Sequence, residues 1–247
     1  FIEKPLGHNK KNLDKLKKLL KNNNKFISMV GYNMRFNPLY IFLKKYLKKN
    51  KLGKINHVEI FNGEHIADFH KYEDYRTSFA SRKSLGGGVT LTLIHEIDYL
   101  YWFFGQVQEV FSITGKFSNL KIQSSDLSAI IMKFQNNIIA EIHLDYFQKP
   151  ETRSCKIIGT KGTIVWNSKT NDVKLYNLKN KKWSTKLKIK NYKKNDMYKK
   201  ELAHFIQCIK QKKKSQNDLS QGNYVLKIAL GIIKSSKLKK VITIEKN

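Results

Sequence analysis

Hydrophobic positions in the first part of the chain alternate between helical and extended spacing. Leucines on one helical face, opposite a lysine-rich face, predict a helix over residues 7–24 (Leu13, Leu16, Leu19 and Leu20). The nearly continuous apolar run that follows predicts a strand over residues 25–32. Because Phe1 and Ile2 are typical of the end of a buried strand, the three segments together predict a parallel β-α-β piece whose strands are covered on both faces.

The next helix has a clear start signal. Asn37 can cap a helix and Pro38 suits the first helical position, so we predict a helix from there to Gly53. An apolar segment predicts a strand over residues 55–61. Residues 62–84 are polar, and a polar stretch this long between two ordered elements is often a binding loop or a lid.

The longest apolar run, residues 85–105, predicts a buried helix. It begins at the triplet Gly86-Gly87-Gly88 and stops at Gly105, as a packed helix bounded by glycines would. Three titratable groups lie inside it: His95, Glu96 and Asp98. Buried charge is costly unless it is paired or used, so the histidine is a candidate for chemistry. The competing interpretation is a core histidine held by a backbone carbonyl.

Beyond residue 105 the pattern changes to short extended segments. Strands are predicted at residues 107–117, 126–134, 138–147, 155–159, 163–166, 172–176 and 183–189. Turn residues at 135–137 and 160–162 join neighbouring segments into hairpins. Helical spacing returns at residues 196–210 and 221–236, and residues 241–244 predict a last strand.

The net charge of the chain is large, but it changes this picture little. The chain has 48 Lys and Arg residues against 19 Asp and Glu residues, a net charge of +29, but only four are arginines (Arg35, Arg76, Arg82 and Arg153). Nucleic-acid binders usually use arginine for bidentate contacts. Lysine is enriched here together with Asn, Ile, Tyr and Phe, and all of these residues are encoded by A/T-rich codons. We therefore expect no nucleic-acid partner, and a basic nucleic-acid binder is the third-ranked hypothesis.

Three further classes of protein are disfavoured by the sequence. No apolar run reaches the roughly 18 residues that a membrane span needs, so we expect no membrane partner. Cys155 and Cys208 match no metal or redox spacing, which indicates reduced thiols and a cytoplasmic location. His65, Asp68 and His70 lack a recognised ligand spacing, so we expect no metal.

Five short segments carry a family resemblance through their order and spacing. They are Glu3-Lys4-Pro5, residues 31–38, residues 86–105 with the glycine triplet, His95 and Asp98, the turn Gly159-Thr160-Lys161-Gly162, and Met197-Tyr198 with Glu201, Leu202 and Phe205. In this order they resemble the Gfo/Idh/MocA oxidoreductases, the family of glucose-fructose oxidoreductase and inositol dehydrogenase. The resemblance covers essentially the whole chain.

The resemblance implies an α/β fold in two parts. Residues 1–33 would be the C-terminal remnant of a Rossmann NAD(P)-binding domain. Residues 34–247 would be a C-terminal substrate domain, a large, mostly antiparallel sheet with helices on one face. No G-x-G-x-x-G follows a predicted strand. We therefore expect an N-terminally truncated member that lacks the main binding loop for NAD or NADP and is inactive by itself. The open sheet face favours a homo-oligomer.

The resemblance also implies residue roles. Lys4 would stabilise negative charge on the substrate oxygen, and His95 would move the hydroxyl proton as general acid or base. The cofactor would contact Glu3, Lys4 and Pro5, and the Lys4-Pro5 peptide bond is a candidate for the cis form. Arg76 could meet an anionic group. The predicted substrate-binding residues are Asn33, Arg35, Arg76, Thr92 and Asp98. Competing interpretations are a turn residue for Asn33 and a salt bridge for Arg35.

Thr92 departs from the pattern of the family, which usually has an aspartate one helical turn before the histidine. Threonine can form a hydrogen bond but cannot stabilise an imidazolium by charge. Either Asp98 or Glu96 compensates, or the enzyme is weakened, or its chemistry differs. We predict an NAD(P)-dependent oxidoreductase that transfers hydride between nicotinamide and a hydroxyl or keto carbon of a sugar or sugar derivative, as in surface-polysaccharide biosynthesis. The alternative is a degenerate, non-catalytic relative that binds a sugar or a partner.

Overall fold

The first segment of the chain differs from its prediction. The computed structural model describes every residue except 10, 12, 14, 17, 19–25 and 246–247. The helix predicted over residues 7–24 lies for the most part outside the described residues. The strand predicted over residues 25–32 is wrong in extent, because within residues 26–32 only Val30 forms a bridge, a parallel one to Ile2. Asn217 binds both the N–H and the carbonyl of Val30. These two backbone groups are therefore not available to pair with a further strand.

The helix that follows begins where the sequence predicts. After the 3-10 helix η1 (Asn33–Phe36), helix α2 spans Pro38–Lys48. The side chain of Asn37 accepts a hydrogen bond from the Leu39 N–H at 2.9 Å, which satisfies one of the free donors at a helix start. The capping prediction is confirmed.

Nine strands of the described chain form one sheet in the order β8-β7-β6-β5-β1-β4-β3-β2-β9. All neighbours pair antiparallel except β1 and β4, which are parallel. The bounds are β1 Ile55–Gly63, β2 Val107–Gly115, β3 Leu127–Phe134, β4 Ile139–Asp145, β5 Thr152–Gly159, β6 Gly162–Asn167, β7 Asp172–Asn177, β8 Lys182–Lys188 and β9 Ile242–Thr243. The predicted α/β class with a large, mostly antiparallel sheet is confirmed.

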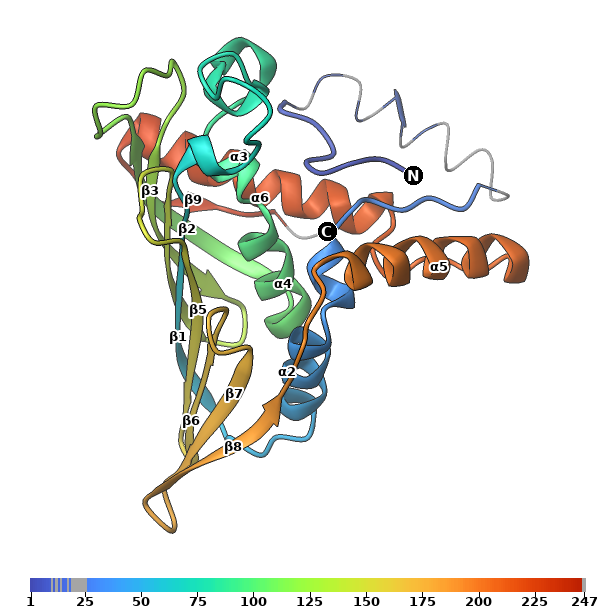
Figure 1. Ribbon diagram of the computed structural model, residues 1–247, viewed down its shortest axis with the longest axis vertical. Helices are drawn as coiled ribbons and strands as arrows, with labels where there is room; N and C mark the ends of the chain where they lie inside the picture. Colours follow the sequence, from blue (N-terminus) through green and yellow to red (C-terminus); the bar gives the residue numbers. More distant parts are fainter. Residues whose placement is uncertain (10, 12, 14, 17, 19–25, 246–247) are drawn as a thin grey trace.

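Helices cover one face of this sheet. Figure 1 shows α2 and α4 (His95–Phe104) side by side on one side of the strands. Helix α6 (Leu219–Leu238) packs against β2, where the Ser112 hydroxyl donates to the Ile232 carbonyl at 2.7 Å. Helix α5 (Asn195–Gln211) projects away from the sheet. Large apolar side chains remain exposed on β2 and β3, at Phe111, Ile113 and Ile131. The core therefore fills one side of the sheet and leaves the other open.

The buried helix predicted over residues 85–105 is two helices, and this part of the prediction is wrong. Helix α3 spans only Val89–Thr92, and α4 starts at His95. Helix α3 starts only at Val89 because Gly86 and Gly88 have φ values of +81° and +124°, which a right-handed helix does not allow. Between the helices, the Glu96 N–H turns to the carbonyl of Leu93 at 3.5 Å instead of that of Thr92. The carbonyl of Thr92 is thereby released from the helix.

Two other boundaries matter for function. Strand β5 starts at Thr152, three residues before the predicted start at 155, so Arg153 belongs to the sheet. The polar stretch 62–84 begins with the last two residues of β1 and contains the short 3-10 helices η2 (Ile66–Asp68) and η3 (Phe79–Ser81). Within the described residues, no helix is both long and apolar enough to cross a membrane.

Candidate active site

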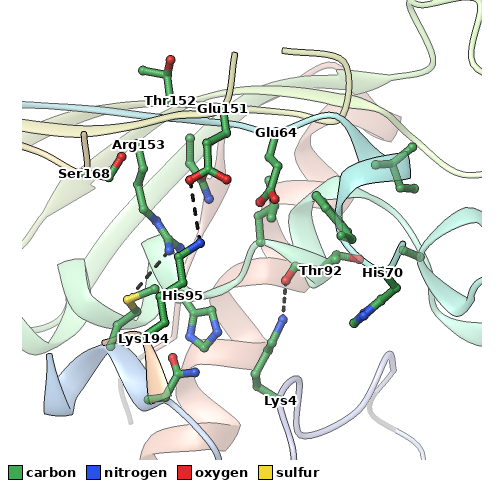
Figure 2. Close-up of a pocket in the computed structure, with 18 of the residues that line it drawn as sticks. Lys4, Glu64, His70, Thr92, His95, Glu151, Thr152, Arg153, Ser168 and Lys194 are labelled. Carbon is green, nitrogen blue, oxygen red and sulfur yellow. Dashed lines mark hydrogen bonds and ion pairs between the residues drawn. The ribbon is translucent and has the colours of Figure 1, made fainter. Parts of the chain in front are cut away.

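A cleft of about 440 Å³ lies where the N-terminal segment, the α3–α4 junction and the ends of β1 and β5 meet. Residues of the predicted binding loop form part of its wall (Asn62, Glu64, Ile66, Phe69, His70, Glu73, Tyr75, Ser78, Phe79 and Ala80). Four of the predicted site residues also line it: Lys4, Asn33, Thr92 and His95. Figure 2 shows Lys4 and His95 entering the cleft from the same side. The structure thus brings the two predicted catalytic side chains to one cavity.

The amine of Lys4 is held by main chain rather than by a side chain. Its Nζ donates a hydrogen bond of 2.6 Å to the Thr92 carbonyl, the group that the helix break releases (Figure 2). Burial lowers the pKa of Lys4 to about 8, and the charge of Glu96 opposes part of this shift. The peptide bond between Lys4 and Pro5 is cis, as predicted. The lysine is therefore oriented, and it loses its charge at a lower pH than an exposed lysine does.

His95 is buried and uncharged. Its side chain is the first of α4, its exposed fraction is 8 %, and its ring stands edge-on to that of Tyr32 at a centroid distance of 6.2 Å. Burial lowers its pKa well below the ordinary value, and the positive charges of Lys4 and Arg153 lower it further. Among the described residues, none bonds to Nδ1. A neutral imidazole in this position can accept a proton.

Glu96 does not serve as a counter-charge for His95. Its Oε1 accepts bonds of 2.6 Å from both Nε and Nη2 of Arg153, which reaches across from β5. The Glu96 side chain is fully buried and that of Arg153 is 19 % exposed. Arg153 lines the cleft, yet sequence reasoning gave it no role. Its position depends on the start of β5, which the alternation of apolar residues did not reveal.

Arg35 and Asp98 form a buried ion pair with no exposed side-chain surface. Arg35 Nη2 lies 2.6 Å from Asp98 Oδ1, and Nε lies 3.0 Å from Oδ2. The remaining nitrogen, Nη1, donates to the carbonyl of Gln216 and to the side chain of Gln221, each at 2.6 Å. Neither member of the pair lines the cleft. The geometry matches the salt-bridge interpretation of Arg35.

Three other predicted residues also lie away from the cleft. Arg76 is exposed, and its Nη2 lies 2.6 Å from the carboxylate of Asp74. The Glu3 carboxylate rests on Gly31, where an added Cβ would come within 3.0 Å of Oε2. Pro5 is partly buried and does not line the cleft. The structure does not bring these side chains to the cavity that holds His95.

Sequence reasoning missed the opposite wall of the cleft. Glu64 and Glu151 point into it across from Lys4 and His95, and Lys194 reaches toward Glu151 from beside His95 (Figure 2). Burial and the nearby charge of Glu151 raise the pKa of Glu64. Lys194 Nζ lies 3.8 Å from Glu151 Oε1. Over the described part of the chain, no group of three or more His, Cys, Asp or Glu side chains is arranged to hold a metal ion.

Comparisons with known proteins identify the family of the chain. The Gfo/Idh/MocA model described as "Oxidoreductase family, C-terminal alpha/beta domain" matches residues 44–244. No curated protein matches the sequence. A levoglucosan dehydrogenase solved with NADH has a TM-score of 0.88 at 16 % identity, over 99 % of this chain and 73 % of its own. Myo-inositol 2-dehydrogenase from Lactobacillus plantarum has a TM-score of 0.78 at 21 % identity, over 98 % and 72 %.

These structural similarities show a shared fold. An oxidoreductase domain protein from Kribbella flavida gives the same result, with a TM-score of 0.86 at 15 % identity over 99 % of this chain and 74 % of its own. The family model covers most of the sequence and agrees with the observed sheet and helices. The chain belongs to the Gfo/Idh/MocA family of oxidoreductases.

Proposed function

We propose that the protein is an NAD(P)-dependent oxidoreductase that transfers hydride between nicotinamide and a hydroxyl or keto carbon of a sugar or sugar derivative. The observation that carries this proposal is the convergence of the Lys4 amine and the His95 imidazole on one cleft. Family membership supports oxidoreductase chemistry. Sugar substrates are supported by the relatives of the same fold, since levoglucosan dehydrogenase was solved with levoglucosan and with L-sorbose.

Lys4 acts on the oxygen of the reacting carbon. Negative charge develops on this oxygen as the hydroxyl is oxidised, and a fixed ammonium beside it stabilises that charge. The bond to the Thr92 carbonyl keeps the amine in place before the substrate binds. With a pKa of about 8, Lys4 is still mostly protonated at pH 7.

His95 takes the hydroxyl proton. Its lowered pKa keeps the imidazole neutral, which is the form that a base requires. The imidazolium that results has no carboxylate at position 92, and Glu96 and Asp98 are each bound to an arginine. The proton therefore has to pass on to water without a stabilising counter-charge. This feature favours the second candidate function, a relative that binds a sugar or a partner without catalysis.

The cleft fits the nicotinamide end of the cofactor. A neutral heteroaromatic ring with a carboxamide needs apolar surface and a few polar groups, and Leu93 and Met197 provide the first while Lys4 and Asn33 provide the second. When bound, the cofactor supplies the acceptor or donor of the hydride. In this proposal residues 1–33 belong to the nucleotide-binding part and residues 34–247 to the substrate domain.

The test uses the protein as its gene encodes it, with His95→Ala, Lys4→Ala and Thr92→Asp variants. His95→Ala should lower kcat/KM on a panel of sugars by about 10²-fold or more and leave NADH binding unchanged, because only proton transfer is removed. His57→Ala is the matched control, since His57 lies on β1 beside Glu59 and Glu141. Full activity of His95→Ala would refute the role. A large gain in rate for Thr92→Asp would show that the missing carboxylate limits catalysis.

A further inference from the structure

One ion pair joins the helix that begins at His95 to the sheet. Glu96 is the second residue of α4, and Arg153 is the second residue of β5. Glu96 Oε1 lies 2.6 Å from both Nε and Nη2 of Arg153, and the Glu96 side chain has no exposed surface. Figure 2 shows the Arg153 side chain reaching from the sheet toward the side of the cleft where His95 lies. The pair therefore fixes two opposite charges beside the groups of the proposed reaction.

The carboxylate end of the pair acts mainly on Lys4. Burial lowers the pKa of this amine to about 8, and among the charged groups Glu96 has the largest effect and acts to raise it. Arg153 acts in the opposite direction and less strongly, and Glu3 adds a smaller favourable contribution. The ion pair as a whole therefore favours the charged form of the amine, the form that stabilises an oxyanion.

The guanidinium end of the pair acts on His95. Burial lowers the pKa of the imidazole well below its ordinary value, and the positive charges of Lys4 and Arg153 lower it further. Consecutive residues of a helix do not face each other, so the side chain of Glu96 does not face the ring before it. The imidazole therefore experiences mainly the positive end of the pair, which favours its neutral form.

The surroundings of the pair screen it weakly. Two tyrosines of the core, Tyr40 and Tyr99, interact with Arg153, and both are fully buried. Burial raises their pKa values well above the ordinary value, so they carry no charge near neutral pH. The other titratable groups that interact with Arg153, Lys4 or His95 lie in the segments around the cleft (Glu3, Tyr32, Glu64 and Tyr198). An ion pair enclosed by uncharged groups acts more strongly on nearby charges than one in water does.

We propose that the ion pair of Glu96 and Arg153 sets the charges of both catalytic groups. Its carboxylate stabilises the ammonium of Lys4, and its guanidinium disfavours an imidazolium at His95. Oxidation of a hydroxyl requires a charged lysine and a neutral histidine at the same pH, and the two ends of one ion pair supply these opposite influences. Glu96 and Arg153 are positioning residues in this role, because they act through Lys4 and His95. The inference rests on the proposed oxidoreductase and names the residues that prepare its reacting groups.

The test follows both titrations by NMR in the whole protein without substrate, with isotope-labelled histidine and lysine. The signals of His95 and Lys4 are identified by their loss in His95→Ala and Lys4→Arg. In the double variant Glu96→Gln, Arg153→Gln, His95 should bind a proton about 10-fold more tightly and Lys4 about 3-fold less tightly. Loosening of the cleft alone would relieve burial and strengthen proton binding at both groups. The opposite shift of Lys4 is therefore the specific sign of the ion pair.

The matched control is the double variant Glu59→Gln, Lys156→Gln. It removes another ion pair of β5, one whose side chains are 45 % and 43 % exposed at the open face of the sheet, so both titrations should stay as in the wild type. Arg153→Lys keeps the positive charge and should keep His95 neutral over the same pH range. If the glutamine pair does not fold, Glu96→Met, Arg153→Met replaces it, because apolar substitutes for a buried ion pair are often stable.

Unchanged proton binding at either group in the double variant overturns the proposal, and so does tighter binding at both. Turnover is a separate measurement. The double variant of an active enzyme should work over a narrower pH range of kcat/KM, because His95 gains its proton at a higher pH and Lys4 loses its proton at a lower pH. Opposite shifts in a protein that never oxidises sugars with NAD or NADP retain the role of the ion pair and contradict the oxidoreductase. An active enzyme with unchanged titrations contradicts the role of the ion pair alone.

Discussion

The ion pair between Arg35 and Asp98 gives a sharp prediction about stability. Asp98→Ala removes a carboxylate whose two oxygens both bind the guanidinium, at 2.6 and 3.0 Å. Neither side chain has any exposed surface, so the arginine charge would stay buried without its counter-ion. Breaking a buried pair in this way costs about 3–5 kcal/mol of the free energy of unfolding.

The assay is urea unfolding at pH 7, followed by circular dichroism. Asp74→Ala serves as the control, because it breaks the exposed pair with Arg76 and should leave the midpoint unchanged. Removing both buried charges, with Arg35→Met and Asp98→Leu, should recover most of the loss. The recovery stays incomplete because Arg35 also binds Gln216 and Gln221.

The result also separates a structural role from a substrate role for Asp98. A loss of less than about 1 kcal/mol for Asp98→Ala would refute the reasoning from burial. Weaker sugar binding by a variant of unchanged stability would instead assign Asp98 to the substrate. Because the side chain is fully enclosed, we expect the stability loss.

Two further predictions concern Lys4 and the open sheet face. Lys4 has a pKa of about 8, so kcat/KM should fall about tenfold per pH unit above that value as the ammonium loses its proton. Lys4→Arg, whose side chain stays charged, should remove this alkaline loss, and a fall that persists in Lys4→Arg would contradict the assignment. We also expect a homo-oligomer through the apolar surface around Phe111, Ile113 and Ile131. Light scattering should show a smaller species for Ile131→Lys, and a wild type that is monomeric at every concentration would contradict this.

Local patterns predicted the sheet well. Buried Ala140, Ile142 and Leu144 alternate with exposed Glu141, and this period of two depends only on which face of β4 meets the core. The start of α2 was equally predictable, because Asn37 supplies the cap from within its own segment. Such features are encoded by neighbouring residues and need no knowledge of distant ones.

Long-range pairing limited the prediction of the site. The break between α3 and α4 falls inside the apolar run Leu91 to Ile94, with no glycine or proline to mark it. Glu64 and Glu151 lie far apart in the sequence and become neighbours only through the register of β1 and β5. His95 was a candidate from its place in the buried apolar run, whereas Lys4 was found only through a family resemblance, since neither spacing nor composition links the two. Contacts between residues far apart in the sequence are not indicated by the residues next to them in the chain.

The main-chain anchor of Lys4 has a consequence for how this site can vary. The amine binds the carbonyl at position 92, and every amino acid supplies that carbonyl. Any side chain that preserves the interruption after α3 leaves the lysine where it is, so substitutions at this position need not displace it. Sequence comparisons that require an acidic residue at position 92 would exclude chains in which the lysine is held by the same carbonyl. In the proposed mechanism, substitutions at Thr92 can change proton transfer while the amine of Lys4 stays fixed.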